Sequence, residues 1–100
     1  MVNFDKNEVE EVLKKIEHPE IAYTLFDLGM IKHVKLENNV VKLTLKVPML
    51  GVPILDYLVA SIKESVKEKF PGLEVDIDVA EMNIEERERF MRMAREAWRG

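Results

Sequence analysis

Residues 41–47, VKLTLKV, alternate apolar and polar side chains without a break. Successive side chains of a β-strand point to opposite faces, so this pattern predicts a strand with one buried face. Residues 73–79, LEVDIDV, repeat the alternation, and a further strand is expected over residues 31–36. Because Asn tolerates left-handed conformations, Glu37-Asn38-Asn39 predicts the turn that joins strands 31–36 and 41–47 into an antiparallel hairpin.

Apolar residues spaced three and four positions apart predict helices around these strands. The first helix begins at a capping box of Asp5 and Glu8, and it ends because Pro19 disfavours helical geometry in the residues before it. The second helix begins at Pro53, since proline suits the first turn of a helix. It ends at Pro71-Gly72.

A last helix is expected over residues 84–98, behind a second capping box of Asn83 and Glu86. The whole chain, residues 1–100, therefore reads as one domain with the element order α-β-β-α-β-α. The β-α-β step makes the third strand parallel to the second, which gives a three-stranded mixed sheet. With the helices on its one apolar face, where Val79 is also expected, the predicted fold is an α/β (α+β) two-layer sandwich.

The composition narrows the classes of function. The formal net charge is −4, which disfavours nucleic acid as a partner. The sequence shows neither a secretory signal nor an apolar run as long as a membrane span, so a cytoplasmic protein with no membrane contact is expected. Abundant Glu, Lys and Arg without any glutamine is typical of thermophilic proteins.

The chain has no cysteine, which excludes disulfides and thiolate metal sites within one chain. Its two histidines, His18 and His33, lack the i,i+4 helical spacing and the neighbours that a zinc site requires. A surface or turn position is therefore expected for them, and no bound metal or cofactor is predicted.

Four short motifs lie within and next to the predicted hairpin. They are His18-Pro19-Glu20-Ile21, Phe26-Asp27-Leu28-Gly29-Met30-Ile31, Leu43-Thr44-Leu45-Lys46-Val47-Pro48 and Gly51-Val52-Pro53. Together they resemble the MIP18 family (DUF59), which implies the fold above and a role in iron–sulfur cluster maturation. In that family a cysteine usually stands just before the helix proline, at a helix start that lowers the pKa of a thiol. Here Val52 occupies that position.

Further departures from the family surround the same site. The loop 48–53 is longer than usual, Lys46-Val47 precede the proline, and Ala80-Glu81-Met82-Asn83 replaces a Pro-Pro-Trp stretch. These departures predict a scaffold that keeps the fold without thiol chemistry. The candidate pocket or partner-binding residues are Glu20, Asp27, Leu28, Gly29, Thr44, Pro48, Val52 and Pro53.

Alternative interpretations of this site remain open. The apolar loop 48–53 forms a pocket for an apolar group or a partner's side chain, or it packs onto its own core. Asp27 and Glu20 share one site, or each caps a local turn, as Asp often does ahead of glycine.

The last helix carries apolar residues of the adaptable kind found at interfaces, set among arginines. Met91, Met93 and Trp98 are therefore candidates for contact with a partner or with a second copy of the chain. The alternative is that the apolar residues of this helix simply cover the core.

These features together predict a non-enzymatic accessory or adaptor protein that holds no cluster with thiols of its own. Its expected partners are the iron–sulfur assembly machinery or client proteins. The alternative is a structural or regulatory subunit, such as a homodimer formed through the last helix. A subunit of an oxygenase-type enzyme system that uses Glu20 and Asp27 ranks last, because no base, nucleophile or metal set is evident.

Overall fold

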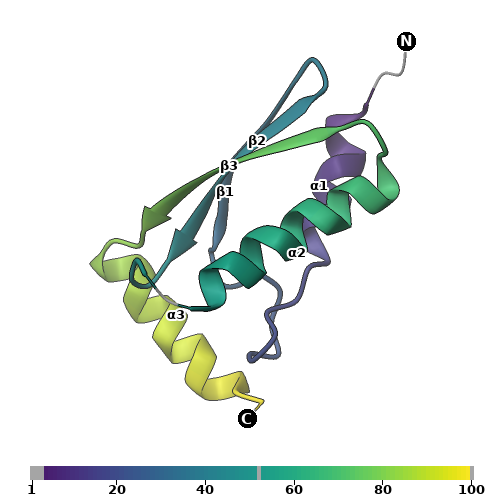
Figure 1. Cartoon of the computed structure of the whole chain (residues 1–100). Coiled ribbons are helices and arrows are strands. Elements are labelled where there is room, and N and C mark those ends of the chain that lie inside the picture. Colours follow the sequence, from purple (N-terminus) through teal and green to yellow (C-terminus); the bar gives the residue numbers. More distant parts are fainter. Residues whose placement is uncertain (1–3, 52, 100) are drawn as a thin grey trace.

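The computed structural model describes residues 4–51 and 53–99, which form an elongated molecule of 45 × 23 × 23 Å (Figure 1). The elements in chain order are α1 (Lys6–Lys14), β1 (Ile31–Glu37), β2 (Val40–Val47), α2 (Ile54–Lys69), β3 (Glu74–Glu81) and α3 (Ile84–Ala97). This order confirms the predicted α-β-β-α-β-α. Among the described residues, no helix has the length and apolar character needed to span a membrane.

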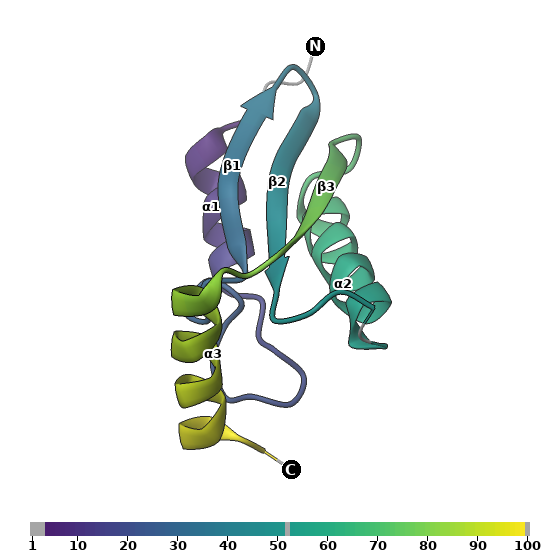
Figure 2. The same ribbon diagram turned by 90° about the vertical axis from the view of Figure 1, so that its left-hand side faces the viewer.

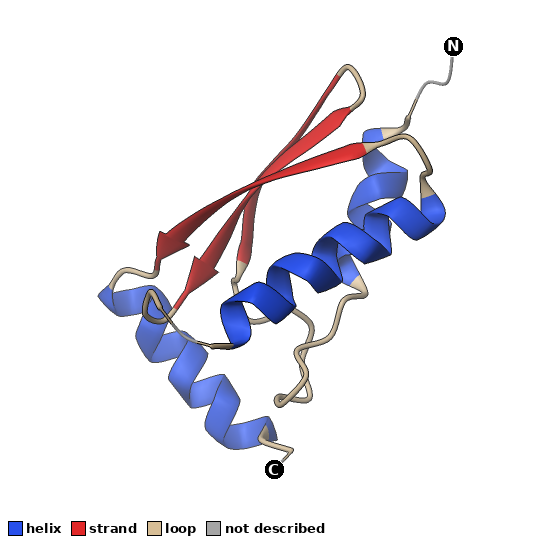
Figure 3. Cartoon of the chain, in the orientation of Figure 1, coloured by secondary structure: helices blue, strands red, loops and turns tan. Residues whose placement is uncertain are grey.

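β2 lies at the centre of a mixed sheet with the order β1-β2-β3 (Figure 3). It pairs antiparallel with β1 across a turn at Asn38, whose φ of 54° is the left-handed conformation expected there. It pairs parallel with β3 in an unbroken register, from Val40 opposite Glu74 to Val47 opposite Glu81. The hairpin and the parallel third strand are both confirmed.

β1 departs from simple alternation at His33. Its register against β2 shifts between Lys32 and Lys35, and His33 has a φ of 54°. The extra residue of this bulge allows Ile31 and Val34, which would otherwise point to opposite faces, both to pack against the core. Ile31 therefore joins Val34 on the inner face only because of the bulge.

α1 and α2 cover the same face of the sheet and form a second layer (Figures 1 and 2). Their buried residues meet the inward side chains of β2. The residues that pack between the two layers are Val9, Leu13, Leu58, Ile62 and Val66 from the helices and Val41, Leu43, Leu45 and Val47 from β2. Burial of this apolar surface is the main source of stability in the fold.

The end of β3 differs from the sequence prediction. Val79, expected on the apolar face, is exposed, and Ala80 is the half-buried residue instead. The alternation changes where β3 turns toward α3 (Figure 2). The last part of β3 therefore belongs to the junction with α3 more than to the layer that α2 covers.

The helix boundaries follow mostly from sequence signals close to each helix end. Asp5 caps α1 as predicted, but its side chain accepts a hydrogen bond of 2.8 Å from the Asn7 amide and not from the Glu8 amide of the predicted capping box. α1 ends at Lys14, earlier than Pro19 requires, because the chain after it folds back on itself and pairs residues 16–18 with residues 23–25. α2 ends at Lys69, and Gly72 has a φ of 96° in the turn between this helix and β3.

α3 does not join α1 and α2 on the sheet; it extends past the end of the sheet, beside the irregular segment 16–30 (Figure 2). Its buried Phe90 and Ala94 belong to the core. The Ala22 amide donates a hydrogen bond of 2.8 Å to the Ala97 carbonyl oxygen. The two-layer arrangement therefore holds for α1 and α2, while α3 packs on the segment 16–30.

Candidate functional site

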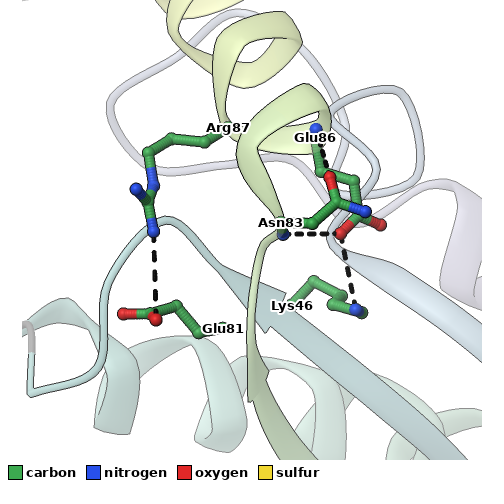
Figure 4. A network of polar contacts seen from close by, with 5 residues as sticks. All are labelled: Lys46, Glu81, Asn83, Glu86 and Arg87. Carbon is green, nitrogen blue, oxygen red and sulfur yellow. Dashed lines mark hydrogen bonds and ion pairs between the residues drawn. The ribbon is translucent and has the colours of Figure 1, made fainter.

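A polar network joins the end of β2 to the start of α3 (Figure 4). The Asn83 side chain accepts a 2.8 Å hydrogen bond from the Glu86 amide, and Glu86 Oε1 accepts one of 2.9 Å from the Asn83 amide, which completes the predicted capping box. Lys46 Nζ lies 3.4 Å from the same Glu86 oxygen. The Asn83 amide and the Lys46 ammonium favour the carboxylate form, so the pKa of Glu86 lies below its ordinary value.

Arg87 ties the loop 48–53 to α3. Its Nε donates a hydrogen bond of 2.8 Å to the Pro48 carbonyl oxygen. Its Nη2 lies 3.9 Å from Glu81 Oε1 (Figure 4). One guanidinium thus holds the first residue of the loop and the last residue of β3. Nothing in the sequence predicted this role, because it depends on the long-range approach of α3 to the loop.

The tip of the loop is apolar and exposed. Met49 and Leu50 follow Pro48 and show most of their surface to solvent, as does Tyr57 in the first turns of α2. Val52 lies outside the described residues. Pro53 is exposed at the start of α2, and no side-chain hydrogen bond caps this helix. In its described part, the loop presents apolar side chains outward and does not bury them in its own core.

Asp27 caps a local turn. Its Oδ2 accepts a hydrogen bond of 3.4 Å from the Thr24 amide, and the Thr24 hydroxyl accepts one of 3.0 Å from the Asp27 amide. Asp27 also lines a surface hollow of about 420 Å³, together with Lys14, Lys15, Glu17, Ala22, Tyr23 and Thr24. The turn-capping alternative for Asp27 therefore matches its hydrogen bonds.

His18 lies in the irregular segment after α1, and it is buried and not at the expected surface position, with 4% of its surface exposed. Its Nδ1 accepts a hydrogen bond of 3.0 Å from the Glu20 amide, and its ring meets the Phe90 ring edge-on at 6.4 Å between centroids. Burial lowers the pKa of His18, although the nearby Glu20 carboxylate opposes this shift. The Glu20 side chain itself is exposed, and its carbonyl oxygen accepts from the Arg99 amide at 2.9 Å.

The other predicted pocket residues are spread over different surfaces. Leu28 is buried in the core, and Gly29 has a φ of 74° with Arg89 of α3 close by. Thr44 lies between the inward-facing Leu43 and Leu45, so it points to the opposite, outer face of the sheet. Leu28 and Thr44 are therefore separated by the sheet and do not line one pocket.

The three predicted interface residues of α3 divide between two roles. Met93 is half-buried against the core, whereas Met91 and Trp98 are exposed. Sequence spacing alone could not separate them, because the side of α3 that is covered depends on how the segment 16–30 packs on it.

The chemistry available at this site is limited. Within residues 4–51 and 53–99, no three His, Asp or Glu side chains gather as a set that could hold a metal ion. Iron–sulfur clusters are held mainly by cysteine thiolates, and the 100 residues contain none. The donor groups of the chain therefore do not match the usual ligand chemistry of a cluster.

Comparison with known proteins places the chain in a family. A family model described as "Iron-sulfur cluster assembly protein" matches residues 6–79, which end before α3. A solved structure of a domain of unknown function, DUF59, from Bacillus anthracis is similar to the fold with a TM-score of 0.69 and 24% sequence identity, over 90% of this chain and 87% of that one.

No protein of curated function matches the chain. The likeness to the DUF59 structure concerns the fold, and the family model covers most of the sequence, including β1, β2 and the loop 48–53 but not α3. The chain therefore belongs to the family of iron–sulfur cluster assembly proteins, the MIP18 (DUF59) family.

Proposed function

We propose that this chain is a non-enzymatic accessory protein of iron–sulfur cluster assembly that acts by binding other proteins. The observation that carries the proposal is the loop 48–53. It stands where a cysteine is expected from the family resemblance, and it presents exposed Met49 and Leu50 instead. An apolar loop tip that is tied at its base by Arg87 offers a preordered contact for an apolar surface on a partner.

In this proposal the cluster is cargo, and the thiolates that hold it belong to a partner. Asp27 and Glu86 already have local partners, since Asp27 caps the turn at Thr24 and Glu86 caps α3 at Asn83. These engagements also count against an enzyme that uses Asp27 as an acid or base, because a catalytic group must reach its substrate.

Anaerobic reconstitution with ferrous iron and sulfide tests whether the chain holds a cluster. The purified protein is expected to stay colourless after desalting and to retain no iron or sulfide. A cluster-binding protein treated in parallel shows that the procedure works. A stable, stoichiometric cluster on this chain would contradict the proposal that it acts without ligating one.

Affinity capture tests the loop as a partner-binding element. The wild-type chain is expected to retain iron–sulfur assembly factors or client proteins from a native lysate, identified by mass spectrometry. A Met49→Ser/Leu50→Ser variant is expected to lose them, whereas Met91→Ser, a change at an exposed methionine of α3, is expected to retain them. Partners unrelated to iron–sulfur proteins, or equal capture by the loop variant, would count against the proposal.

A further inference from the structure

Three exposed apolar side chains form one stripe along the outer side of α3. Ile84, Met91 and Trp98 show 72%, 45% and 55% of their surface, and each follows the previous one by seven residues. Seven residues make almost two turns of an α-helix, so side chains at this spacing lie on the same side of it. This is the spacing of a coiled-coil seam, in which apolar residues face a second helix.

A hollow lies at the carboxyl-terminal end of this stripe. It holds about 490 Å³ and is lined by Phe90, Met91, Ala94, Arg95 and Trp98. Four of these residues are at positions i, i+3, i+4 and i+7, the arrangement that receives one side chain from a facing helix in knobs-into-holes packing. Ala94 is small, which leaves the floor of the hollow open.

Ile84 is the exposed side chain of the stripe with the shape to fill such a hollow. It stands at the other end of α3, about 15 Å from Ala94 at 1.5 Å per residue, so it cannot reach the hollow of its own chain. A second copy that runs antiparallel would bring its Ile84 to that position. By symmetry, the Ile84 of the first copy would then enter the hollow of the second.

The charges of α3 fit the same arrangement. Within α3, residues 84–88 carry three glutamates and one arginine, whereas residues 89–97 carry three arginines and one glutamate. Within residues 4–51 and 53–99, none of the ion pairs involves Glu85, Glu88, Arg92 or Arg95. The helix dipole favours acidic residues in the first turn and basic ones in the last, but it does not account for the exposed apolar stripe between them.

We propose that the chain forms a two-fold symmetric dimer through antiparallel packing of α3 against α3. Ile84 of each copy fills the hollow of the other, and the acidic start of each helix faces the basic end of its partner. With Ile84 opposite the hollow, the two-fold axis passes near residue 89. Glu88 and Arg95 lie on the same side of the stripe, so Glu88 of one copy and Arg95 of the other are offset by about 7 Å along the helices, and their long side chains, which each lean toward the start of their own helix, point toward each other. This proposal goes beyond the proposed function and does not depend on it, because the dimer forms through α3 whereas the proposed function rests on the loop 48–53.

Sedimentation equilibrium over a range of concentrations tests the dimer. The wild-type chain is expected to associate reversibly as a dimer. Ile84→Glu is expected to weaken the dimer by about tenfold or more, since a buried interface anchor is replaced by a charge. Glu suits the first turn of a helix, so the variant should still fold, which circular dichroism checks. Met49→Glu, at a side chain 59% exposed in the loop, is the matched control and should leave the dimer intact.

Charge reversal tests the orientation and the register. Glu88→Arg and Arg95→Glu should each weaken the dimer, and the double variant should restore it, because both cross-pairs are then re-formed with opposite sign. A double variant no stronger than either single variant would overturn the antiparallel pairing. A wild-type chain that stays monomeric, or a dimer that Ile84→Glu leaves unchanged, would overturn the proposal as a whole.

Single thiols give a second measure of orientation, since the chain has no cysteine of its own. Glu88 lies near the two-fold axis of the proposed dimer, whereas Trp98 lies far from it. Under mild oxidation Glu88→Cys should therefore form a covalent dimer and Trp98→Cys should not. Efficient cross-linking of Trp98→Cys would indicate parallel packing and would overturn the antiparallel arrangement.

Discussion

The two ends of this elongated molecule have different surfaces. At the end with the β1–β2 turn and α1, the described residues expose no large apolar side chain. At the end where β2 and β3 finish, such side chains gather on the loop 48–53, on the first turns of α2, near the end of β3 and on α3. They are Met49, Leu50, Tyr57, Val79, Ile84, Met91 and Trp98. The contrast suggests that one end holds the fold together and the other is available for contacts.

The largest expected effect comes from weakening the packed layer between sheet and helices. Leu45 is fully buried in the middle of β2, and Leu45→Ala removes its packing and leaves a cavity. We expect the free energy of unfolding to fall by about 2–5 kcal/mol, measured by urea denaturation. A loss below about 1 kcal/mol would mean that the layer is loosely packed and that the contrast between the two ends is weaker than described.

A smaller effect is expected at the start of α3, where the apolar end of the molecule depends on a polar cap. Asn83→Ala removes the side-chain acceptor for the Glu86 amide and should lower the free energy of unfolding by about 1 kcal/mol. Amide exchange should rise in the first turn of α3. Asn7→Ala is the control, because Asn7 contributes its backbone amide and not its side chain to the cap of α1.

The next effect is a loss of stability at acidic pH, which is absent at neutral pH. The pKa of His18 is lowered by burial from its ordinary value of 6.5, so the unfolded chain binds a proton more readily than the folded one. Stability should therefore fall as the pH drops below about 6.5, and protonation of Nδ1 would also remove the acceptor for the Glu20 amide.

Urea denaturation between about pH 7.5 and 5.5 measures this loss. His18→Asn keeps a side-chain oxygen acceptor without a titrating group in this range, so its stability should change less over the same interval. The lowered pKa of Glu86 acts in a more acidic range, below its ordinary value of 4.5. Parallel curves for the wild type and His18→Asn would show that burial of His18 has no consequence for stability.

The smallest effect on stability is expected at the loop tip. Met49→Ser should change the free energy of unfolding by less than about 0.5 kcal/mol, because the side chain already faces solvent. The same substitution should reduce partner capture when it is combined with Leu50→Ser. A large loss of stability would show that the loop supports the fold, and it would remove the distinction between the two ends.

Local patterns in the sequence predicted the parts of the fold that depend on neighbours along the chain. The alternation in residues 41–47 identified the central strand, and the Asn83–Glu86 pair identified the start of α3. The inward position of Ile31 could not be predicted, because it depends on a bulge opposite β2. Burial of His18 could not be predicted either, since Phe90 covers it from the far end of the chain.

The candidate site was predicted less completely than the fold, for the same reason. The motifs identified the loop 48–53 and the turn at Asp27, but the residues grouped with them lie on different faces, as Leu28 and Thr44 show. Arg87, which ties the loop to α3, carries no sequence signal of its role. Grouping residues into one site requires the packing of distant segments, which a single sequence does not contain.

The outer position of β3 in the sheet has a consequence for how copies of this chain assemble. A flanking strand with an unpaired backbone edge can add strands from other molecules and lead to open-ended aggregates. Glu74, Asp76 and Asp78 are exposed along β3, so parallel stacking of identical strands at this edge would bring rows of like charges together. The acidic edge therefore discourages pairing of β3 with the β3 of another copy, which is compatible with closed association through α3.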